Sequence, residues 1–365
     1  MKIAVVSSGL GHVTRGIETW ADDLGTALHR RGVDVTLIKG GGTATRPFEQ
    51  VVRCARRDSG MAKTINKLLP KAAWRFGCGS PYQIEQTTFA LRLIPKLRAE
   101  RFDIVHLQDY LVADWLEKAH RRGRIPTKVI LAHGTEEPAE SLAHFEYLQE
   151  LAPYYLKDRS NGKRFAIPNF VDVERFSPEG ERLDLNLPKD AFVILTVSAI
   201  KRFHKRVDAV IEEVAQLPAP AHLVVAGARE PETDDVIRLG KQRLGDRVTF
   251  LENFDRANMP ALYRSADVLL HGALNEMMPI ALLEATASGL PVVAHQWPVI
   301  EWIVGDGGTC VDAQVSGNLA TAVRRYLSPE FRAEKSRNAR SRAVKLFSED
   351  VVVHQILQMY KTVLS

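Results

Sequence analysis

The feature that most constrains the fold of this 365-residue chain is an alternation of short, wholly apolar runs with helical patterns. Residues 2–7 form such a run, a glycine-containing loop follows, and a helical pattern over 17–32 leads into a second run at 33–38. A run that is apolar throughout is typical of a parallel strand covered on both faces. The sequence therefore predicts that the chain opens a doubly wound α/β domain.

The loop between the first strand and the first helix is a candidate ligand loop. It contains Gly9, Gly11 and Gly16 but has neither the G-x-G-x-x-G spacing of a dinucleotide fingerprint nor the G-K-[ST] of a P-loop. Glycine lets a backbone approach a ligand closely where a helix begins. A tight turn without any ligand would use the same residues, so the loop is a weak signal by itself.

The alternation continues in two series, which predicts two domains. Strands are expected at 103–107 and 128–132, and after a break at 192–197, 222–226, 248–251, 268–271 and 291–294. A chain of this length is too long for one comfortable core. We predict a first domain over 1–170, a proline-containing and charged linker over 171–190, a second domain over 191–345, and a last helix over about 348–364.

The stretch from Asn275 to Ala294 carries the most informative pair of side chains. Glu276 and Glu284 lie eight residues apart, at the start of an apolar helical pattern that ends at Gly289. If both belong to one helix, they are roughly 12 Å apart, since a helix rises about 1.5 Å per residue. That separation suits an elongated polar ligand held at two points better than a single metal ion.

Two further positions follow predicted strands, where parallel sheets hold their binding groups. His133 comes directly after the strand at 128–132. A lone histidine is more often structural than catalytic, and this position makes the two roles about equally expected. The loop 201–206 reads Lys-Arg-Phe-His-Lys-Arg and follows the strand at 192–197. Its cations suit a diphosphate, and an exposed basic turn is the plainer interpretation.

The net charge of +5 is unevenly distributed along the chain. Residues 46–101 contain 12 basic and 4 acidic residues, and Lys63, Lys67 and Lys71 recur every fourth position beside apolar residues. This pattern predicts a short basic amphipathic helix interrupted near Pro70. It is either a surface helix with a solvated lysine face or a contact for an anionic partner, such as a membrane surface.

Composition argues against several classes of protein. No apolar run reaches the roughly 18 residues of a membrane-spanning helix, and the first residues lack the length of a signal peptide. The three cysteines have no metal-ligand spacing, and their odd number argues against a disulfide framework. The basic residues are not interleaved with aromatics as in nucleic-acid modules. We expect a cytoplasmic protein, in contact with the inner face of the membrane if the basic segment binds lipid, with no bound metal and no nucleic acid.

The residues from Glu276 to Glu284, followed by Gly289 and Pro291, form an E-x7-E element. Five other segments accompany it along the chain: Arg15–Glu18, His133–Thr135, Ile167–Asp172, Lys205–Asp208 and Leu262–Val268. In their order and spacing these segments resemble the family-4 retaining glycosyltransferases, in which two Rossmann-like domains of the GT-B fold face each other across a cleft. The resemblance covers nearly the whole chain except residues 43–100.

The resemblance implies a role for each of these residues. Glu284 would bind the ribose of a nucleotide-diphosphate sugar, Glu276 would lie near the transferred sugar, and Lys205 would neutralise the diphosphate. His133 would contact the sugar from the first domain. The donor site would also include Gly16, Lys201, Arg202, Met278, Pro279 and Ile280. No divalent metal and no cofactor is implied, because the nucleotide sugar is a co-substrate, and the last helix (346–365) would return to the first domain.

Two departures from the family pattern leave the donor open. Ala199 stands where the family usually has an arginine, so Arg202 or Lys201 would have to replace it. Met277-Met278-Pro279 stands where Gly-Phe-Gly is usual, and proline removes one backbone donor. A UDP-sugar, such as UDP-glucose or UDP-GlcNAc, is the expected donor, and a hydroxyl in glycan, polysaccharide or glycolipid assembly is the expected acceptor. The acceptor would be lipid-linked or anionic.

Two other interpretations remain. His12, in the loop after the first strand, is similar to the general base of inverting GT-B enzymes, which would give the opposite anomeric outcome. The chain could also bind a nucleotide sugar without transferring it.

Overall fold

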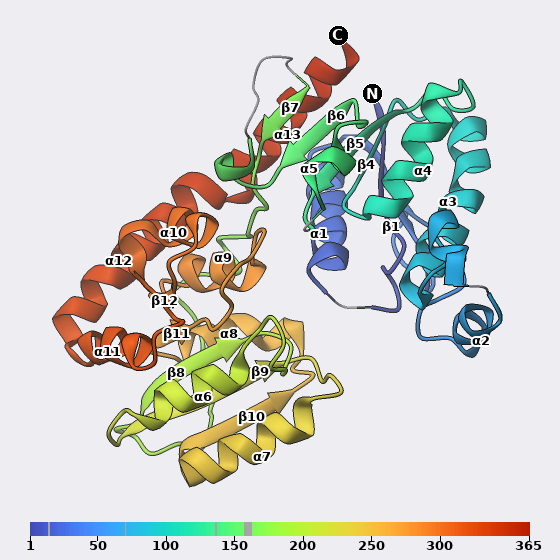
Figure 1. Cartoon of the computed structure of the whole chain (residues 1–365). Coiled ribbons are helices and arrows are strands. Elements are labelled where there is room, and N and C mark those ends of the chain that lie inside the picture. The colour runs from blue at the N-terminus through green and yellow to red at the C-terminus, as the bar shows by residue number, and fades with distance from the viewer. Residues whose placement is uncertain (14, 70, 136, 157–162) are drawn as a thin grey trace. The chain divides into compact units, whose positions relative to one another are not determined.

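The computed structural model describes residues 1–365 except 14, 70, 136 and 157–162, and it contains two α/β units (Figure 1). The first unit consists of Met1–Pro168 together with Val353–Ser365, and the second of Asn169–Val352. Each unit has its own parallel sheet and its own hydrophobic core. No helix in the described part of the chain is both long enough and apolar enough to cross a bilayer.

The sheet of the first unit has the strand order β3-β2-β1-β4-β5-β6-β7, seven strands over the described residues. Its strands are β1 (Lys2–Ser7), β2 (Asp34–Lys39), β3 (Glu49–Val51), β4 (Ile104–Leu107), β5 (Lys128–His133), β6 (Tyr147–Glu150) and β7 (Arg164–Ala166). Its helices are α1 (Gly16–Arg30), α2 (Gly60–Leu68), α3 (Pro81–Glu100), α4 (Tyr110–Arg121) and α5 (Ala139–Leu142), with turns of 3₁₀-helix at η1 (Lys71–Phe76) and η2 (Pro153–Tyr155). The helix α13 (Glu349–Leu364) adds its residues from Val353 onward to this unit.

The sheet of the second unit has the order β10-β9-β8-β11-β12-β13, six strands over the residues described. They are β8 (Phe192–Val197), β9 (Ala221–Gly227), β10 (Val248–Glu252), β11 (Val268–Leu270), β12 (Val292–His295) and β13 (Gly308–Val311). The helices are α6 (Val207–Ala215), α7 (Thr233–Leu244), α8 (Met259–Arg264), α9 (Ile280–Ala287), α10 (Pro298–Val304), α11 (Asn318–Arg324) and α12 (Pro329–Phe347). Turns of 3₁₀-helix are η3 (Gly245–Arg247), η4 (Arg256–Asn258), η5 (Gly305–Gly307) and η6 (Arg325–Leu327).

Each sheet reverses its strand order once, and this reversal positions the candidate sites. In the first sheet the reversal lies between β1 and β4, and in the second it lies between β8 and β11. The loops that leave two such strands diverge to opposite sides, and the crevice between them is where open α/β sheets bind ligands. The two loops at the reversal of the second sheet begin at Ser198 and His271.

The doubly wound fold and the helix α2 were correctly predicted, and four short strands and two helices were not. The missed strands β3, β6, β7 and β13 have three or four residues each, and the missed helices are α5 and α12. The predicted interruption at Pro70 lies outside the described residues.

Candidate functional site

The candidate site of the second unit lies at the reversal of its sheet, where two loops meet through a charged pair. Lys205, from the loop after β8, donates to Glu276, from the loop after β11, over 2.5 Å between Nζ and Oε1. Both loops leave carboxyl ends of strands that are neighbours in the sheet, so residues 71 positions apart in sequence come into contact. The structure thus brings together two residues that the sequence singled out separately.

Glu276 is held by a third residue that sequence reasoning missed. His271 is the first residue after β11, and its Nε2 lies 3.3 Å from the same Oε1 that Lys205 contacts. Glu276 is only 8% exposed. Burial alone would raise the pKa of Glu276, but the His271 imidazole and the Lys205 ammonium lower it to about 2. Glu276 is therefore a carboxylate at any ordinary pH.

The expectation that both glutamates belong to one helix is wrong for Glu276. The helix α9 begins at Ile280, with Pro279 as its N-cap residue, so Glu276 lies in the preceding loop. A residue before proline is disfavoured in the α conformation, so the helix does not extend back beyond Pro279. The indole N–H of Trp297 holds this loop by donating to the backbone carbonyl of Glu276 at 3.2 Å. The separation estimated from a continuous helix therefore does not apply.

Glu284 lies one turn inside α9 and has different partners. The hydroxyl of Tyr263 donates to its Oε2 at 2.9 Å, and the guanidinium of Arg256 lies 3.9 Å from Oε1. Tyr263 is fully buried, and burial together with the neighbouring carboxylate raises its pKa well above the ordinary value. The tyrosine thus remains a hydrogen-bond donor that fixes one oxygen of Glu284.

The basic loop after β8 contains one cation with a structural role and others that are partly or fully exposed. Arg206 adopts a left-handed conformation with φ of 50° and donates to the backbone carbonyl of Ala313 at 3.2 Å, so it holds neighbouring loops together. Lys201 is half-buried and Arg202 is exposed. The carboxylate of Glu232 accepts from the backbone N–H of Arg202 at 2.8 Å, which supports the turn.

Three other candidates of the second unit surround the start of α9. Met278 and Pro279 are buried, and Ile280 is half-buried as the first helical residue. The backbone N–H of Leu282 bonds to the carbonyl of Pro279 at 3.1 Å, so the helix begins directly after the proline. Met278 and Pro279 form an apolar wall beside the loop that carries Glu276.

In the first unit, His133 ends β5 and is oriented by a second carboxylate. Its Nδ1 lies 2.8 Å from Oε2 of Glu150, which ends the neighbouring strand β6. Its Nε2 lies 3.7 Å from Glu137 and has no hydrogen-bond partner among the described residues. A carboxylate on one ring nitrogen determines which way the other nitrogen points. Glu150 was missed because β6 itself was not predicted.

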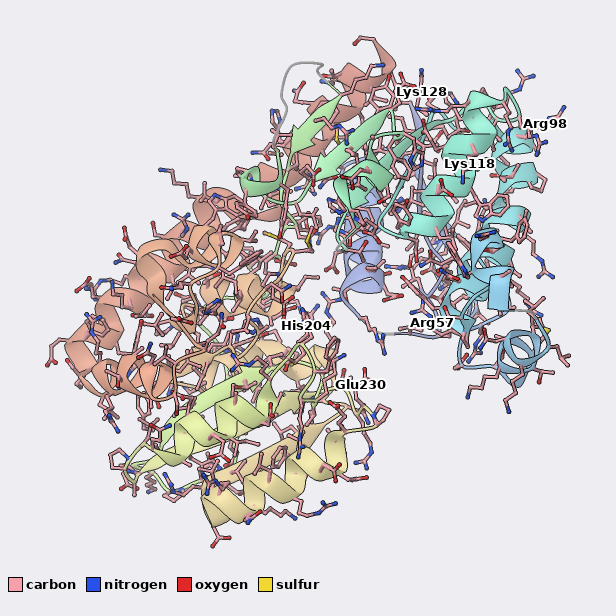
Figure 2. All side chains as sticks on the ribbon, viewed as in Figure 1. Arg57, Arg98, Lys118, Lys128, His204 and Glu230 are labelled. Atoms are coloured by element: carbon pink, nitrogen blue, oxygen red, sulfur yellow. The ribbon has the colours of Figure 1, made fainter. Side chains whose placement is uncertain are left out.

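The two candidate residues that follow β1, Gly16 and His12, have different surroundings. Gly16 is exposed and begins α1, with Arg15 as the N-cap residue. The side chain of His12 is 2% exposed, and its Nε2 lies 2.8 Å from Oε2 of Glu85. Arg57 pairs with the other oxygen of Glu85 at 2.5 Å (Arg57 is marked in Figure 2). His12 thus belongs to a buried polar network with Glu85 and Arg57.

That network also reaches the reversal point of the first sheet. The hydroxyl of Ser8, just after β1, donates to Asp109, just after β4, over 2.9 Å. Burial and the nearby charge of Glu18 raise the pKa of Asp109 to about 6. The network therefore places buried polar side chains at the carboxyl ends of β1 and β4.

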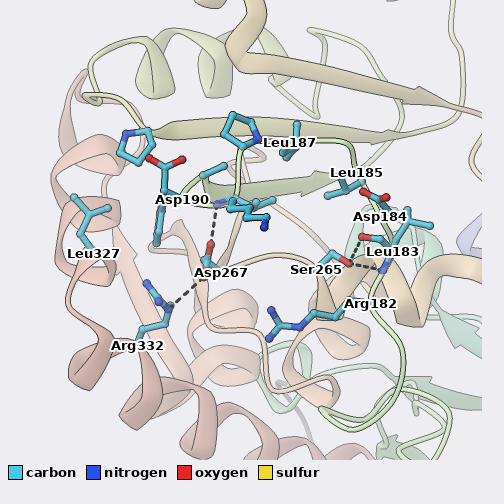
Figure 3. A pocket seen from close by; sticks show the side chains of 16 residues that line it. Arg182, Leu183, Asp184, Leu185, Leu187, Asp190, Ser265, Asp267, Leu327 and Arg332 are labelled. Atoms are coloured by element: carbon cyan, nitrogen blue, oxygen red, sulfur yellow. Dashed lines mark hydrogen bonds and ion pairs between the residues drawn. The ribbon is translucent and has the colours of Figure 1, made fainter.

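A cavity of about 560 Å³ in the second unit lies away from this chemistry (Figure 3). It is lined by residues 182–185 and 187–193 and by Pro220, Ser265, Asp267, Leu327 and Arg332. Asp267 immediately precedes β11 and Phe192 begins β8, so the cavity lies at the amino ends of these strands, the opposite edge of the sheet from Lys205. Asp267 accepts from the backbone N–H of Val193 at 2.8 Å and pairs with Arg332 at 3.4 Å, so this carboxylate holds structure together. Among the described residues, no cluster of three or more His, Cys, Asp or Glu side chains could hold a metal ion.

The structure thus contains two doubly wound units, each with charged side chains where its strands end. Comparison with solved structures identifies the fold as GT-B. Sucrose-phosphate synthase from Thermosynechococcus elongatus matches with a TM-score of 0.81 at 20% identity, covering 99% of this chain and 98% of that one. The Anabaena protein HepE, solved in complex with UDP-glucose, matches with a TM-score of 0.73 at 15% identity over 99% of this chain and 100% of its own.

Family comparison then places the chain. Residues 14–166 match the family described as Glycosyltransferase Family 4, and residues 179–345 match the family described as Glycosyl transferases group 1. The chain belongs to the family-4, group 1 glycosyltransferases.

Curated relatives include two bacterial D-inositol 3-phosphate glycosyltransferases. The one from Mycolicibacterium smegmatis is 29% identical over 226 residues, which is 60% of this chain and 51% of that protein. The one from Catenulispora acidiphila is 33% identical over 194 residues, 48% of this chain and 45% of that protein. The chain thus spans about half the length of the curated relatives that it matches.

Proposed function

We propose that this chain is a retaining glycosyltransferase that moves a sugar from a nucleotide-diphosphate sugar, in particular a UDP-sugar, to an acceptor hydroxyl. The observation that carries the proposal is the partly buried contact between Lys205 and Glu276 at the reversal of the second sheet. Membership of the glycosyltransferase family supports the reaction class. A UDP donor is supported by HepE, a protein of the same fold that was solved with UDP-glucose.

In this proposal the cations of the basic loop act on the leaving group. Negative charge accumulates on the diphosphate as the glycosidic bond breaks, so a fixed ammonium stabilises the transition state more than the ground state. Lys205 supplies that charge, with Arg202 or Lys201 beside it. Glu276 holds Lys205 in place and, as a permanent carboxylate, accepts hydrogen bonds from sugar hydroxyls.

The nucleotide is held by the neighbouring helix in the same proposal. Glu284 accepts the ribose hydroxyls, and Tyr263 fixes the carboxylate for that purpose. Met278, Pro279 and Ile280 line the sugar site, and for Gly16 and His133 we keep the donor contacts that the resemblance implies. Retention is favoured over inversion because the segment from Glu276 to Glu284 resembles the E-x7-E element of retaining enzymes.

The acceptor we propose is a hydroxyl of an anionic or lipid-linked molecule in glycan, polysaccharide or glycolipid assembly. The bias of residues 46–101 toward basic side chains supports an anionic acceptor. The D-inositol 3-phosphate glycosyltransferases among the relatives have an anionic molecule in their names. All three cysteines are free thiols, which fits the reducing cytoplasm as the place of action.

The experiment is a donor screen followed by variants. Melting temperature is measured with UDP, GDP, ADP and their sugars, since a ligand that binds only the folded state raises it. Sugar release or transfer is then followed with the best donor. Lys205→Ala and Glu276→Ala should each abolish turnover, while Glu284→Ala should weaken nucleotide binding in calorimetry. Lys241→Ala, an exposed lysine of α7, is the matched control.

Two outcomes would contradict the proposal. Near-normal turnover in Lys205→Ala or Glu276→Ala would remove the assigned roles, and donor binding with neither transfer nor hydrolysis would favour a binding protein. The anomeric configuration of the product, read by NMR, distinguishes retention from inversion.

A further inference from the structure

The first unit exposes an unusual concentration of apolar side chains around α2 and η1. Five of the 14 large hydrophobic side chains exposed among the described residues fall within residues 61–76. They are Met61 (57% exposed), Leu68 (80%), Leu69 (37%), Trp74 (60%) and Phe76 (72%). Apolar exposure concentrated in one short segment of a folded domain is typical of an interaction surface.

The same segment is exclusively basic in charge. Residues 59–80 contain four basic residues and no acidic residue. Lys63, Lys67 and Arg75 are exposed, and the guanidinium of Arg75 lies 5.5 Å from the ring centroid of Trp74. We call these three cations, together with the five apolar side chains above, the amphipathic patch.

The geometry of α2 explains why apolar and basic groups share its outer side. Ala62 is buried and Ile65 is half-buried, and both pack on a small cluster that includes Ile84 of α3. Met61 and Leu68 are two turns apart and therefore lie on one flank, while Lys63 and Lys67 are one turn apart on the other. The inner side of α2 thus holds the helix in place, and the outer side takes no part in the core.

The acidic residues that flank residues 59–80 in sequence, Asp58 and Glu85, are both paired with arginines. Asp58 pairs with Arg56 at 2.5 Å, and Glu85 pairs with Arg57 at 2.5 Å. The cations of the amphipathic patch therefore act without a compensating carboxylate in the adjoining loop. A surface that combines uncompensated lysines with protruding Trp, Phe and Leu side chains complements an anionic bilayer, where the charges meet headgroups and the apolar groups enter the acyl boundary.

We propose that the amphipathic patch is a membrane-docking surface for anionic phospholipids. Trp74, Phe76 and Leu68 insert below the headgroups, while Lys63 and Lys67 extend their stems along the interface and keep their ammonium groups at lipid phosphates. The proposal requires no donor and no sugar transfer, so it stands or fails separately from the proposed function. If both hold, a lipid-linked acceptor meets the enzyme at the surface it already binds.

Vesicle co-sedimentation of the full chain tests the proposal. The vesicles contain phosphatidylcholine with 30% phosphatidylglycerol, or phosphatidylcholine alone. We expect binding to the anionic vesicles only, with weakening as salt rises. Because each basic residue near such a surface contributes about a fivefold factor, Lys63→Glu with Lys67→Glu should weaken binding at least twenty-five-fold. Leu68→Ser with Trp74→Ser should also abolish co-sedimentation.

A matched control keeps the charge change and moves its position. Arg98→Glu with Arg124→Glu alters two exposed basic residues of the same unit (Arg98 is marked in Figure 2). Arg98 lies 17 residues after Pro81, the first residue of α3, which corresponds to roughly 25 Å along the helix axis. This control should retain most of the binding.

A second measurement uses the wild-type chain, so it does not depend on a variant folding. Trp74 is largely exposed, and its fluorescence should shift to shorter wavelength with anionic vesicles, whereas Trp74→Phe should co-sediment without that shift. The proposal is overturned if neutral and anionic vesicles bind equally, or if the control weakens binding as much as the lysine pair. It is also overturned if anionic vesicles fail to bind while an acidic protein or DNA does, with the same sensitivity to the variants.

Discussion

Glu276 carries a charge that the surrounding residues preserve. Its carboxylate is buried, and the contacts with His271 and Lys205 bring its pKa to about 2. A carboxyl group whose pKa is lower in the folded than in the unfolded chain stabilises the fold above the unfolded value, near 4.5. That contribution decreases as the pH falls toward 2.

The first prediction follows from this direction of the pKa. The difference in unfolding free energy between wild type and Glu276→Gln should decrease by about 2 kcal/mol between pH 7 and pH 3, because over this range the unfolded wild-type chain takes up a proton on Glu276 while the folded chain stays mostly ionised there. Chemical denaturation of both proteins at the two pH values measures it. A difference that stays constant with pH would show that Lys205 and His271 do not hold the carboxylate in its charged form.

The pair of His133 and Glu150 gives a second prediction at the residue scale, which rests on the proposed function. Glu150→Ala removes the acceptor 2.8 Å from Nδ1 and lets the imidazole rotate. Turnover should fall ten- to a hundredfold with little change in donor KM, because a buried hydrogen bond of this kind is worth about 1–3 kcal/mol.

Glu150→Gln is the conservative variant, since its amide oxygen can accept the same hydrogen bond. It should restore most of the activity, measured as initial rate. Equal loss in both variants, with lowered melting temperatures, would mean that Glu150 is only structural.

At the scale of elements, α9 shows what the sequence could and could not predict. Its end was correctly placed at Gly289, because glycine there adopts a φ of +70°. Its start was placed too early, although Pro279 was visible in the sequence and restricts the residue before it. The role of His271 could not be predicted from the sequence. It depends on how the short strand β11 places the residue that follows it beside the loop that carries Glu276.

The end of α9 supports a prediction with a natural control. Gly289 and Gly32 end two helices with the same pattern of hydrogen bonds and with φ of +70° and +72°. A methyl group on Gly289 would lie 3.0 Å from Cγ of Pro178, whereas one on Gly32 would meet nothing within 4 Å. Gly32→Ala should therefore cost about 1 kcal/mol for the backbone alone.

Gly289→Ala should cost more than Gly32→Ala, because Pro178 must also shift. The unfolding free energies of the two variants, measured under the same conditions, give the comparison. Equal losses of unfolding free energy would show that Pro178 can move away from the added methyl group at no measurable cost.

For the whole molecule, the two-sheet architecture could be predicted from the sequence better than the edge strands and the helix α12. Two parallel sheets followed from apolar runs such as 192–197, which cannot serve as amphipathic helices. The strands β3, β7 and β13 were missed because they are edge strands of three or four residues that are only partly apolar. The helix α12 was missed because its composition is mostly charged, with only Ala339, Ala343 and Phe347 buried.

The division of the first unit between the two ends of the chain leads to the last prediction. Residues 353–365 belong to this unit, although 184 residues that form the second unit separate them from Pro168. Tyr360 is fully buried there and lies 2.7 Å from Nδ1 of His106, which belongs to β4. The buried side chains of this segment are Val353, Ile356, Met359, Tyr360 and Val363.

Deleting residues 353–365 should therefore unfold the first unit and leave the second unit folded. Each large apolar side chain contributes about 1.5–3 kcal/mol by burial, so five of them contribute roughly 8 kcal/mol or more, comparable with the stability of a whole domain. Limited proteolysis and calorimetry of the truncated chain would show cleavage confined to residues 1–168 and one transition fewer. Tyr360→Phe is the control, because it keeps the ring and loses one hydrogen bond worth about 1 kcal/mol. Persistence of a folded first unit in the truncated chain would mean that the helix only covers a core that is already complete.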